Sequence, residues 1–361
     1  MRIVHVVRQF HPSVGGLEDF VYNLANEQVK SGEDVSVFTL NTDFQSGSVL
    51  KNQEYLENGV KILRFKWIGS SRYPICNIPP KLLNDFDVVH VHAVDFFVEY
   101  TALLKRVGLL KSKLVLTTHG GFFHTKNNNR LKMLFFKLIT PISLSVFDDV
   151  ICCSINDFKL FKKFPNSKVI ENGVLPSKFG VGAVDENKKG NDVVYLGRLS
   201  SNKNIPELIA QFSKAVDYPG RLKIIGRSSS GDSEILRTLV SSVTNVDLLL
   251  DIDDCEISAT LNESKFVISA SDYEGFGLGV IELMSYGLVP ILSDAPPTFC
   301  QFVRESKAGC IFNLGKNELS GILLSLLDKY TEADRDNALN YASKFSWSSV
   351  SKEYQLVYQQ K

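Results

Sequence analysis

Short apolar runs rich in valine, isoleucine and leucine alternate with amphipathic segments along the first half of the chain. Runs of this kind predict buried strands at residues 2–7, 35–40, 60–65, 87–93, 113–120, 149–154 and 168–173. The segment after the first run carries apolar residues at helical spacing, namely Phe20, Val21, Leu24, Ala25 and Val29. It predicts a helix that ends at Gly32. Such alternation indicates a parallel sheet covered by helices.

The same alternation begins again after a polar, glycine-containing stretch at residues 180–192. Strands are expected here at residues 192–197, 221–226, 245–250, 265–271 and 288–293. We therefore expect an α/β protein with two doubly wound, Rossmann-like domains, residues 1–175 and 176–345, which face each other across a central cleft. A last helix at about residues 346–361 has an apolar stripe and is expected to pack back on the first domain. Ligands of such sheets bind beyond the carboxyl ends of the strands.

The composition is that of a globular protein. The chain has 361 residues, 44% hydrophobic and 22% charged, with a formal net charge of zero, which suits two ordinary domains and argues against disorder. No apolar run approaches the ~18 residues of a membrane-spanning helix, and the N-terminus lacks the pattern of a signal peptide. Six cysteines without zinc-binding spacing are expected to be reduced thiols in the cytoplasm.

Although the net charge is zero, the charged residues are unevenly distributed along the chain. Residues 101–140 contain eight lysines and arginines and no acid, whereas residues 241–300 contain ten acids and one basic residue. Within the basic segment, Lys132 and Lys137 are interleaved with apolar side chains, which suits contact with an anionic membrane or with a diphosphate. The alternative is a helix packed on the sheet with its lysines in solvent.

Two loops that follow predicted strands carry residues suited to phosphate. Gly15 and Gly16 follow the first strand and allow close approach of the backbone, although the G-x-G-x-x-G fingerprint of dinucleotide binding is absent. Arg198 and Lys203 lie on a short loop after the strand at 192–197, where both cations can converge on one phosphate. The alternative for the two glycines is an ordinary turn, and the alternative for Arg198 and Lys203 is two solvated surface cations.

The segment after the strand at 265–271 combines acids with glycines. Between Glu274 and Glu282 the chain reads GFGLGVI, with a helix expected from Leu278 to Tyr286. Amides at a helix start favour an anion, and the carboxylate of Glu282 can accept hydrogen bonds from adjacent ribose hydroxyls. Because the glycines are entropically costly and are expected to add nothing to packing, a ligand site is favoured over acids that only stabilise the helix start.

Histidines fall into two groups by position. His119 stands at the end of a predicted strand, before two glycines, so its ring is expected to reach the ligand-binding edge. His5, His90 and His92 lie within predicted strands and are expected to be buried structural residues.

An Asp-x-Asp pattern at residues 251–253 suggests a metal site. The spacing of Asp253 and Glu256 before a helix is instead typical of a capping box, so no metal ligand is expected.

Taken together, these motifs resemble the family-4 glycosyltransferases of the GT-B fold. Those enzymes carry a glutamate pair with seven residues between, as in EGFGLGVIE at 274–282, together with a glycine pair after the first strand, an Arg…Lys pair and a histidine–glycine loop. The order matches over nearly the full chain. The segments VVRQFHPSVGGLE, GSSRYPI, TTHGGFFHT and ILSDAPP are similar to the bacterial α-mannosyltransferases of xanthan and acetan assembly.

The resemblance implies a retaining, metal-independent hexosyltransferase that needs no cofactor. It implies transfer of mannose from GDP-mannose to a polyprenyl-diphosphate-linked oligosaccharide, by a peripheral protein on the cytoplasmic face of the inner membrane, with no nucleic acid as partner. The catalytic residues that it implies are His119, Arg198, Lys203 and Glu274. The donor-binding residues that it implies are Gly15, Gly16, Arg198, Lys203, Glu274, Gly275, Phe276, Gly277, Leu278 and Glu282. Candidates for the acceptor or the membrane are Arg72, Tyr73, His124, Arg130, Lys132 and Lys137.

Two departures and several alternatives stand beside the resemblance. Leu175 stands where the family usually has an aspartate, and the segment SSNKN lacks the proline or glutamate that many relatives carry before the lysine. The alternatives are another donor such as UDP-glucose or UDP-GlcNAc, or a GT-B sugar-nucleotide epimerase. A nicotinamide oxidoreductase is disfavoured by the absent fingerprint, and a non-catalytic membrane-docking protein by the intact donor motifs.

Overall fold

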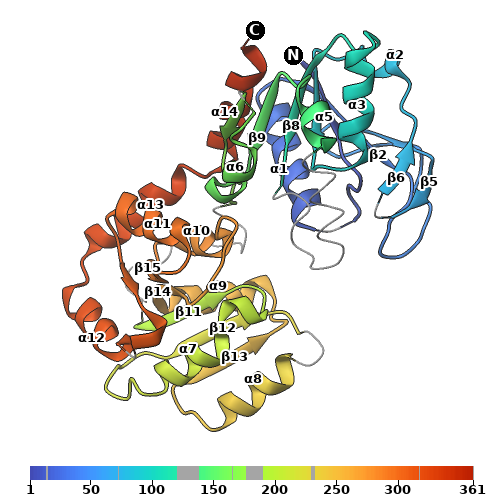
Figure 1. The fold of residues 1–361 in the computed structure, drawn as a ribbon. Helices are drawn as coiled ribbons and strands as arrows, with labels where there is room; N and C mark the ends of the chain where they lie inside the picture. Colours follow the sequence, from blue (N-terminus) through green and yellow to red (C-terminus); the bar gives the residue numbers. More distant parts are fainter. Residues whose placement is uncertain are drawn as a thin grey trace. The chain divides into compact units, whose positions relative to one another are not determined.

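The chain folds into two compact units, which are described separately. The computed structural model describes residues 1–13, 15–71, 73–119, 138–164, 166–175, 190–228, 232–316 and 318–360. The N-terminal unit comprises Met1–Gly173 and Trp347–Lys361, and the C-terminal unit comprises Val174–Ser346 (Figure 1).

A parallel sheet with one antiparallel edge strand forms the centre of the N-terminal unit. Its neighbouring strands are, in order, β10 (Ser167–Val169), β9 (Asp149–Cys152), β8 (Lys113–Thr117), β7 (Val88–His92), β1 (Arg2–Val6), β2 (Asp34–Leu40), β4 (Lys61–Phe65) and the antiparallel β3 (Gln53–Tyr55). The order reverses between β1 and β7. A separate hairpin is formed by β5 (Trp67–Ser70) and β6 (Tyr73–Cys76).

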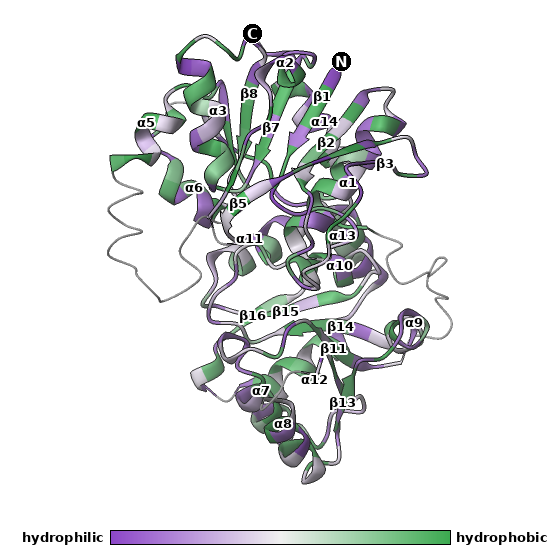
Figure 2. Ribbon diagram, turned by 90° about the vertical axis from the view of Figure 1, so that its right-hand side faces the viewer, coloured by the Kyte–Doolittle hydropathy of each residue, from purple (hydrophilic) through white to green (hydrophobic). Residues whose placement is uncertain are grey.

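Helices cover both faces of this sheet, and the inner strand β8, which is apolar except at its ends, is drawn mostly in green in Figure 2. The helices are α1 (Gly16–Lys30), α2 (Pro80–Leu83), α3 (Phe96–Arg106), α5 (Thr140–Leu144), α6 (Ile155–Phe161) and α14 (Trp347–Gln359). The last of these packs on α1 and buries the apolar stripe, with the ring of Trp347 edge-on to Phe20 at 5.1 Å between centroids. Gly173 admits that ring, because a Cβ atom there would overlap it.

The C-terminal unit is built on an all-parallel sheet. Its neighbouring strands are, in order, β13 (Val246–Leu250), β12 (Leu222–Gly226), β11 (Asp192–Leu196), β14 (Ser264–Ser269), β15 (Val289–Ser293) and β16 (Cys310–Phe312). In chain order this is 3-2-1-4-5-6, the doubly wound arrangement of dinucleotide-binding folds. The strand order therefore reverses between β11 and β14.

Helices fill the crossovers of this second sheet. They are α7 (Ile205–Phe212), α8 (Asp232–Ser241), α9 (Asp254–Asn262), α10 (Leu278–Met284), α11 (Pro297–Ser306), α12 (Leu319–Lys329) and α13 (Glu332–Ser343), with one-turn helices at Ser201–Lys203 and Leu314–Lys316. The predicted capping box is confirmed, because Asp253 Oδ1 accepts from the Glu256 amide at 2.8 Å and Glu256 Oε2 accepts from the Asp253 amide at 3.1 Å.

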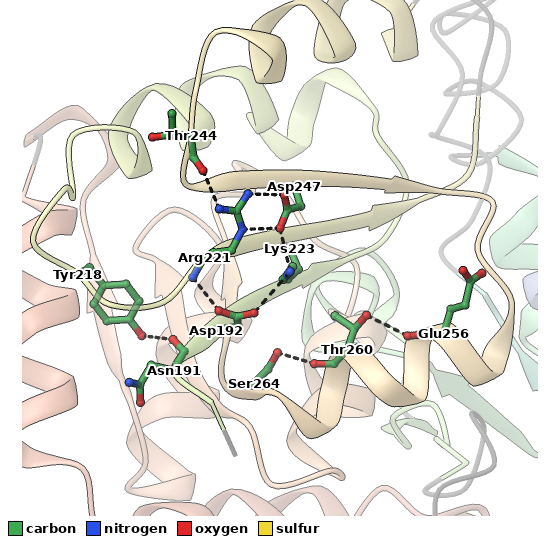
Figure 3. Close-up of polar contacts among 10 residues, drawn as sticks. All are labelled: Asn191, Asp192, Tyr218, Arg221, Lys223, Thr244, Asp247, Glu256, Thr260 and Ser264. Carbon is green, nitrogen blue, oxygen red and sulfur yellow. Dashed lines mark hydrogen bonds and ion pairs between the residues drawn. The ribbon is translucent and has the colours of Figure 1, made fainter. Parts of the chain in front are cut away.

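Charged residues at the amino ends of these strands neutralise one another (Figure 3). The guanidinium of Arg221 donates to Asp247 Oδ2 at 2.7 Å, and Lys223 Nζ lies 2.8 Å from the same oxygen. These bonds lower the pKa of Asp247 to about 2. The charges at this edge of the sheet are therefore explained by their pairing with one another.

Candidate functional site

The carboxyl ends of β11 and β14 bring two of the sequence motifs together. The two strands are paired, with Val194 opposite Val267, so the loops that follow them emerge side by side. Arg198 and Lys203 follow β11, and Glu274 follows β14. This is the point where the strand order reverses, which is where doubly wound sheets bind their ligands.

Main-chain and amide hydrogen bonds join the two loops. The Asp272 amide donates to the carbonyl of Asn202 at 2.9 Å, and Asn202 Nδ2 donates to the carbonyl of Tyr273 at 3.1 Å. Asn204 has a left-handed backbone (φ 51°), and its Nδ2 donates to the carbonyl of Ala270 at 3.0 Å. These three bonds join the loop after β11 to the loop after β14.

Lys203 and Glu274 form an ion pair across these loops. Their side chains are only 12% and 14% exposed, so Lys203 is not the solvated surface cation of the simpler interpretation. The hydroxyl of Ser271 also donates to Glu274 Oε1, at 2.8 Å. Arg198 is exposed on the loop after β11, and its carbonyl accepts from the hydroxyl of Tyr195 at 2.7 Å.

The glycines between the two glutamates have different roles. Gly277 precedes α10 with φ 98°, a conformation that favours glycine, and a Cβ atom on Gly275 would meet nothing within 4 Å. A Cβ atom on Gly279 would lie 2.6 Å from the carbonyl oxygen of Leu196, at the end of β11. The expectation that these glycines add nothing to packing is therefore wrong at Gly279, which lets α10 lie directly against the sheet.

The helix that carries Glu282 is short. The predicted helix from Leu278 to Tyr286 ends at Met284, and α10 has seven residues, so most positive charge for an anion must come from Arg198 and Lys203. Phe276 is 4% exposed, and its ring packs against Phe302 and Phe345. The ring of Phe276 is therefore part of the hydrophobic core, and only its main chain is left as a candidate for contact with a ligand.

In the N-terminal unit the predicted glycine pair lies between β1 and α1. Gly16 is the first residue of α1, and the carbonyl of Gly15 accepts from the Asp19 amide at 2.8 Å. A Cβ atom on Gly15 would overlap the carboxylate of Glu18, whose pKa burial raises. The space beside this helix start is therefore limited by Glu18, a residue that the sequence analysis did not single out.

His119 follows β8 in the left-handed backbone region (φ 50°). Its Nε2 lies 3.2 Å from His92 Nδ1, and its Nδ1 lies 3.6 Å from the sulfur of Cys153. Burial lowers its pKa from 6.5 to about 3, so the ring is neutral at pH 7. Both ring nitrogens thus have partners inside the N-terminal unit, and the residue is half-buried. Contact of this ring with a ligand stays a prediction. His5, His90 and His92 are fully buried, as predicted.

Tyr73 lies beside two acids that sequence reasoning missed. Its hydroxyl donates to Glu99 Oε2 at 3.4 Å, and burial raises the pKa of Glu99 to about 7. Asp95 caps α3 by accepting from the Phe97 amide at 3.0 Å, and burial raises its pKa to about 6. Their only sequence signal is position, between a predicted strand and the helix that follows.

Five predicted acceptor or membrane residues lie outside the described residues. They are Arg72, His124, Arg130, Lys132 and Lys137.

Two Rossmann-like units in one chain are the architecture of the GT-B glycosyltransferases. Residues 14–178 match the family model described as Glycosyltransferase Family 4, and residues 182–345 match the model described as Glycosyl transferases group 1. The chain belongs to the family-4 glycosyltransferases and is a hexosyltransferase.

Relatives match over nearly the whole chain. The GDP-mannose:cellobiosyl-diphosphopolyprenol alpha-mannosyltransferase of Xanthomonas campestris is 36% identical, over 98% of this chain and 95% of its own. The enzyme of that name from Komagataeibacter xylinus is 32% identical, over 100% of this chain and 93% of its own. Among solved structures, the sucrose-phosphate synthase of Thermosynechococcus elongatus has a TM-score of 0.69 at 17% identity, covering 100% of this chain and 98% of that one, which supports the fold.

Among the described residues, no helix combines the length and the apolar character needed to cross a membrane.

Proposed function

We propose that this protein transfers mannose from GDP-mannose, with retention, to an oligosaccharide carried on polyprenyl diphosphate. The observation that carries the proposal is the ion pair between Lys203 and Glu274 where the second sheet reverses its strand order. The relatives of X. campestris and K. xylinus, whose names specify this donor and a diphosphopolyprenol acceptor, support the choice of substrates.

The chemistry of a nucleotide sugar suits this pair. The diphosphate is bonded directly to the anomeric carbon, so a cation for the diphosphate and an acid for the sugar hydroxyls must be neighbours. Lys203 and Glu274 meet that requirement, and exposed Arg198 adds a second cation on the same loop. Glu282, further along α10, is the proposed acceptor of hydrogen bonds from the ribose hydroxyls.

Charge development at the leaving group explains why two cations are needed. As the bond to the anomeric carbon breaks, negative charge grows on the departing diphosphate. Cations held in place before the reaction stabilise this charge without reorganisation. We propose that Arg198 and Lys203 do this without a metal ion, and that the departing phosphate takes the proton of the acceptor hydroxyl, which attacks on the same face.

The acceptor side is assigned to the N-terminal unit. Tyr73 with Glu99 offers hydroxyl and carboxyl groups for sugar hydroxyls. Leu138, Ile139 and Ile142 are exposed at the end of the basic segment, and Arg106 donates to the carbonyl of Ile142 at 2.7 Å. Apolar side chains beside arginine suit a peripheral position on an anionic leaflet, which for a lipid-linked acceptor is the cytoplasmic face of the inner membrane.

The test is transfer of labelled mannose from GDP-mannose to a lipid-linked cellobiose acceptor. We expect K203A and E274A to abolish transfer while the far-UV circular dichroism spectrum is retained. K329A, at the exposed end of α12, is the matched control and keeps full activity. Full activity in both site variants would reject the proposal.

The donor is tested separately by binding. GDP-mannose, UDP-glucose and UDP-GlcNAc are each added to the full chain in a thermal-shift experiment, and GDP-mannose is expected to raise the melting temperature most. A larger rise in melting temperature with UDP-glucose or UDP-GlcNAc would reject GDP-mannose as the donor in favour of that UDP-sugar. Conversion of the donor sugar without any acceptor would favour the epimerase.

A further inference from the structure

A continuous line of hydrogen-bonded side chains runs from helix α1 through buried His5 and His92 to half-buried His119 inside the N-terminal unit. Gln28 Oε1 lies 2.7 Å from His5 Nε2, and His5 Nδ1 lies 2.9 Å from His92 Nε2. His92 Nδ1 lies 3.2 Å from His119 Nε2, and His119 Nδ1 faces the sulfur of Cys153 at 3.6 Å. Each ring thus uses both nitrogens in this chain of hydrogen bonds.

Burial keeps these rings neutral. It lowers the pKa of His5 from 6.5 to about 4, and it lowers the pKa of His92 well below 6.5, with the neighbouring histidines adding to the effect. A neutral imidazole has one N–H donor and one acceptor nitrogen. If the protonated nitrogen of one ring is known, the hydrogen bond to the next ring determines which nitrogen of that ring is protonated.

The direction of the line is set at its first bond. The amide oxygen of Gln28 can only accept, so His5 carries its proton on Nε2 and accepts at Nδ1. His92 must then donate from Nε2, and His119 must donate from Nε2 in turn. The remaining nitrogen of His119 is an acceptor that faces the thiol of Cys153.

A second branch of hydrogen bonds starts from the other atom of the Gln28 amide. Its Nε2 donates to the hydroxyl of Tyr358 at 3.2 Å, and that hydroxyl lies 2.7 Å from His90 Nδ1. Tyr358 therefore donates to His90, whose Nε2–H donates to Thr117 Oγ1 at 2.7 Å. Turning the amide over would reverse the direction of every hydrogen bond in both branches, so the orientation of this one amide sets all four tautomers together.

We infer that Gln28 is a positioning residue, which sets the tautomer of His119 through His5 and His92. His119 is held as the Nε2–H tautomer with both ring nitrogens in use, so its ring does not take the proton of the acceptor hydroxyl. This consequence for transfer rests on the proposed function, whereas the tautomers themselves do not.

The groups around His119 agree with this role. His92 on β7, Cys153 after β9 and Phe20 on α1 face its ring, with Phe20 edge-on at 4.6 Å between centroids. The nearby carboxylate of Asp157 accepts from Thr118 Oγ1 and from the Cys153 amide, so its charge has partners of its own.

A metal ion is the rival explanation of this cluster. Ring nitrogens of His5, His90 and His92 lie within 4.8 Å of one another, which is close enough to share an ion. Those nitrogens are the ones used by the two branches, so metal binding and the tautomer assignment exclude each other.

The test reads tautomers directly in the full chain without substrate. Long-range proton–nitrogen correlation spectra of ¹⁵N-histidine-labelled protein at pH 7.5 are expected to show Nε2–H for His5, His90, His92 and His119, assigned by single histidine substitutions. None of the four should titrate between pH 5.5 and 8. An Nδ1–H tautomer or a titrating ring at His119 would overturn the inference, as would a shift of the cluster signals on addition of zinc chloride.

The variant Q28E distinguishes the two branches, because it is expected to change the tautomer of His90 and to leave that of His119 unchanged. A carboxylate accepts at both oxygens, so Tyr358 must turn its hydroxyl proton towards it and His90 must switch to Nδ1–H, while His119 keeps Nε2–H. A switch at His119, or no switch at His90, contradicts the assignment. If Q28E does not fold, the spectra of the unaltered protein still decide. If the tautomers are found and mannose transfer is not, the proposed function fails and this inference stands.

Discussion

Gly279 of α10 lies directly against the carbonyl oxygen of Leu196 at the end of β11, so that a Cβ atom would stand 2.6 Å from that oxygen. The contact brings the helix that carries Glu282 against the strand that leads to Arg198. Glu282 is proposed to bind the ribose and Arg198 the diphosphate. Their relative position therefore depends on the absence of a side chain at residue 279.

G279A is expected to destabilise the protein and to weaken donor binding. The added methyl must push α10 away from β11, and overpacking of this kind costs about 1–3 kcal/mol. Urea denaturation and GDP-mannose titration measure the two effects. G321A, on α12 and outside the proposed donor site, is the control, because a Cβ atom there meets nothing within 4 Å. Equal behaviour of the two variants would show that the close approach is unimportant.

The ion pair between Lys203 and Glu274 predicts strong coupling between their substitutions. Both side chains are mostly buried, so removing either leaves a charge without its partner. A double-mutant cycle of K203A and E274A in urea is expected to give a coupling energy of about 0.5–3 kcal/mol. Additive changes would mean that the pair contributes nothing to the folded state.

The pattern of apolar residues in the sequence predicted the central strands, because runs of β-branched apolar residues are stable when they are buried in a sheet. It missed β3, β5, β6 and β16, which have three or four residues and too little sequence to show a period. The positions of Arg198, Lys203 and Glu274 after strands were predicted. The pairing of Lys203 with Glu274 was not, because it requires β11 and β14 to be neighbours.

The histidines of the N-terminal unit show the same limit of prediction from sequence: burial can be predicted, but contacts between distant segments cannot. Burial of His5 and His92 follows from their place in apolar strands, and this was predicted. The role of Gln28 was missed, because a polar residue on α1 has a ring as its partner only after β1 packs beneath the helix. Hydrogen bonds between distant segments leave no periodic signal in the chain.

Acid is expected to unfold the protein through these histidines. Their folded-state pKa values lie below the ordinary 6.5, so the unfolded chain binds more protons and stability falls as the pH drops from 6.5 towards 4. One pKa unit corresponds to about 1.4 kcal/mol, so His5 alone accounts for about 3 kcal/mol of this loss.

Urea denaturation at intervals from pH 7.5 to pH 4.5 checks the direction of this change. H5Q is expected to flatten the curve over that range, whereas H11Q, at an exposed position, is expected to leave its slope unchanged. A free energy of unfolding that stays constant down to pH 5 would contradict the buried neutral state.

Replacing Asp253 should affect stability and leave catalysis intact. Its carboxylate caps α9 in a capping box, so D253A is expected to lower the free energy of unfolding by about 1 kcal/mol. Mannose transfer by D253A should equal that of the unaltered protein, with or without added manganese. Loss of transfer that manganese restores would support the metal site that the capping box argues against.

Contact with the membrane is expected to depend on both apolar and basic residues of one segment. Ile142 on α5 is 55% exposed, and Lys132 and Lys137 precede it in the chain. I142D removes an apolar group that can enter the headgroup region, and K132E with K137E reverses the attraction to anionic lipid, so each should reduce sedimentation with phosphatidylglycerol vesicles. L356D, at a position 61% exposed on α14, is the matched control. If all of these variants sediment alike, the protein reaches its lipid-linked acceptor without this segment.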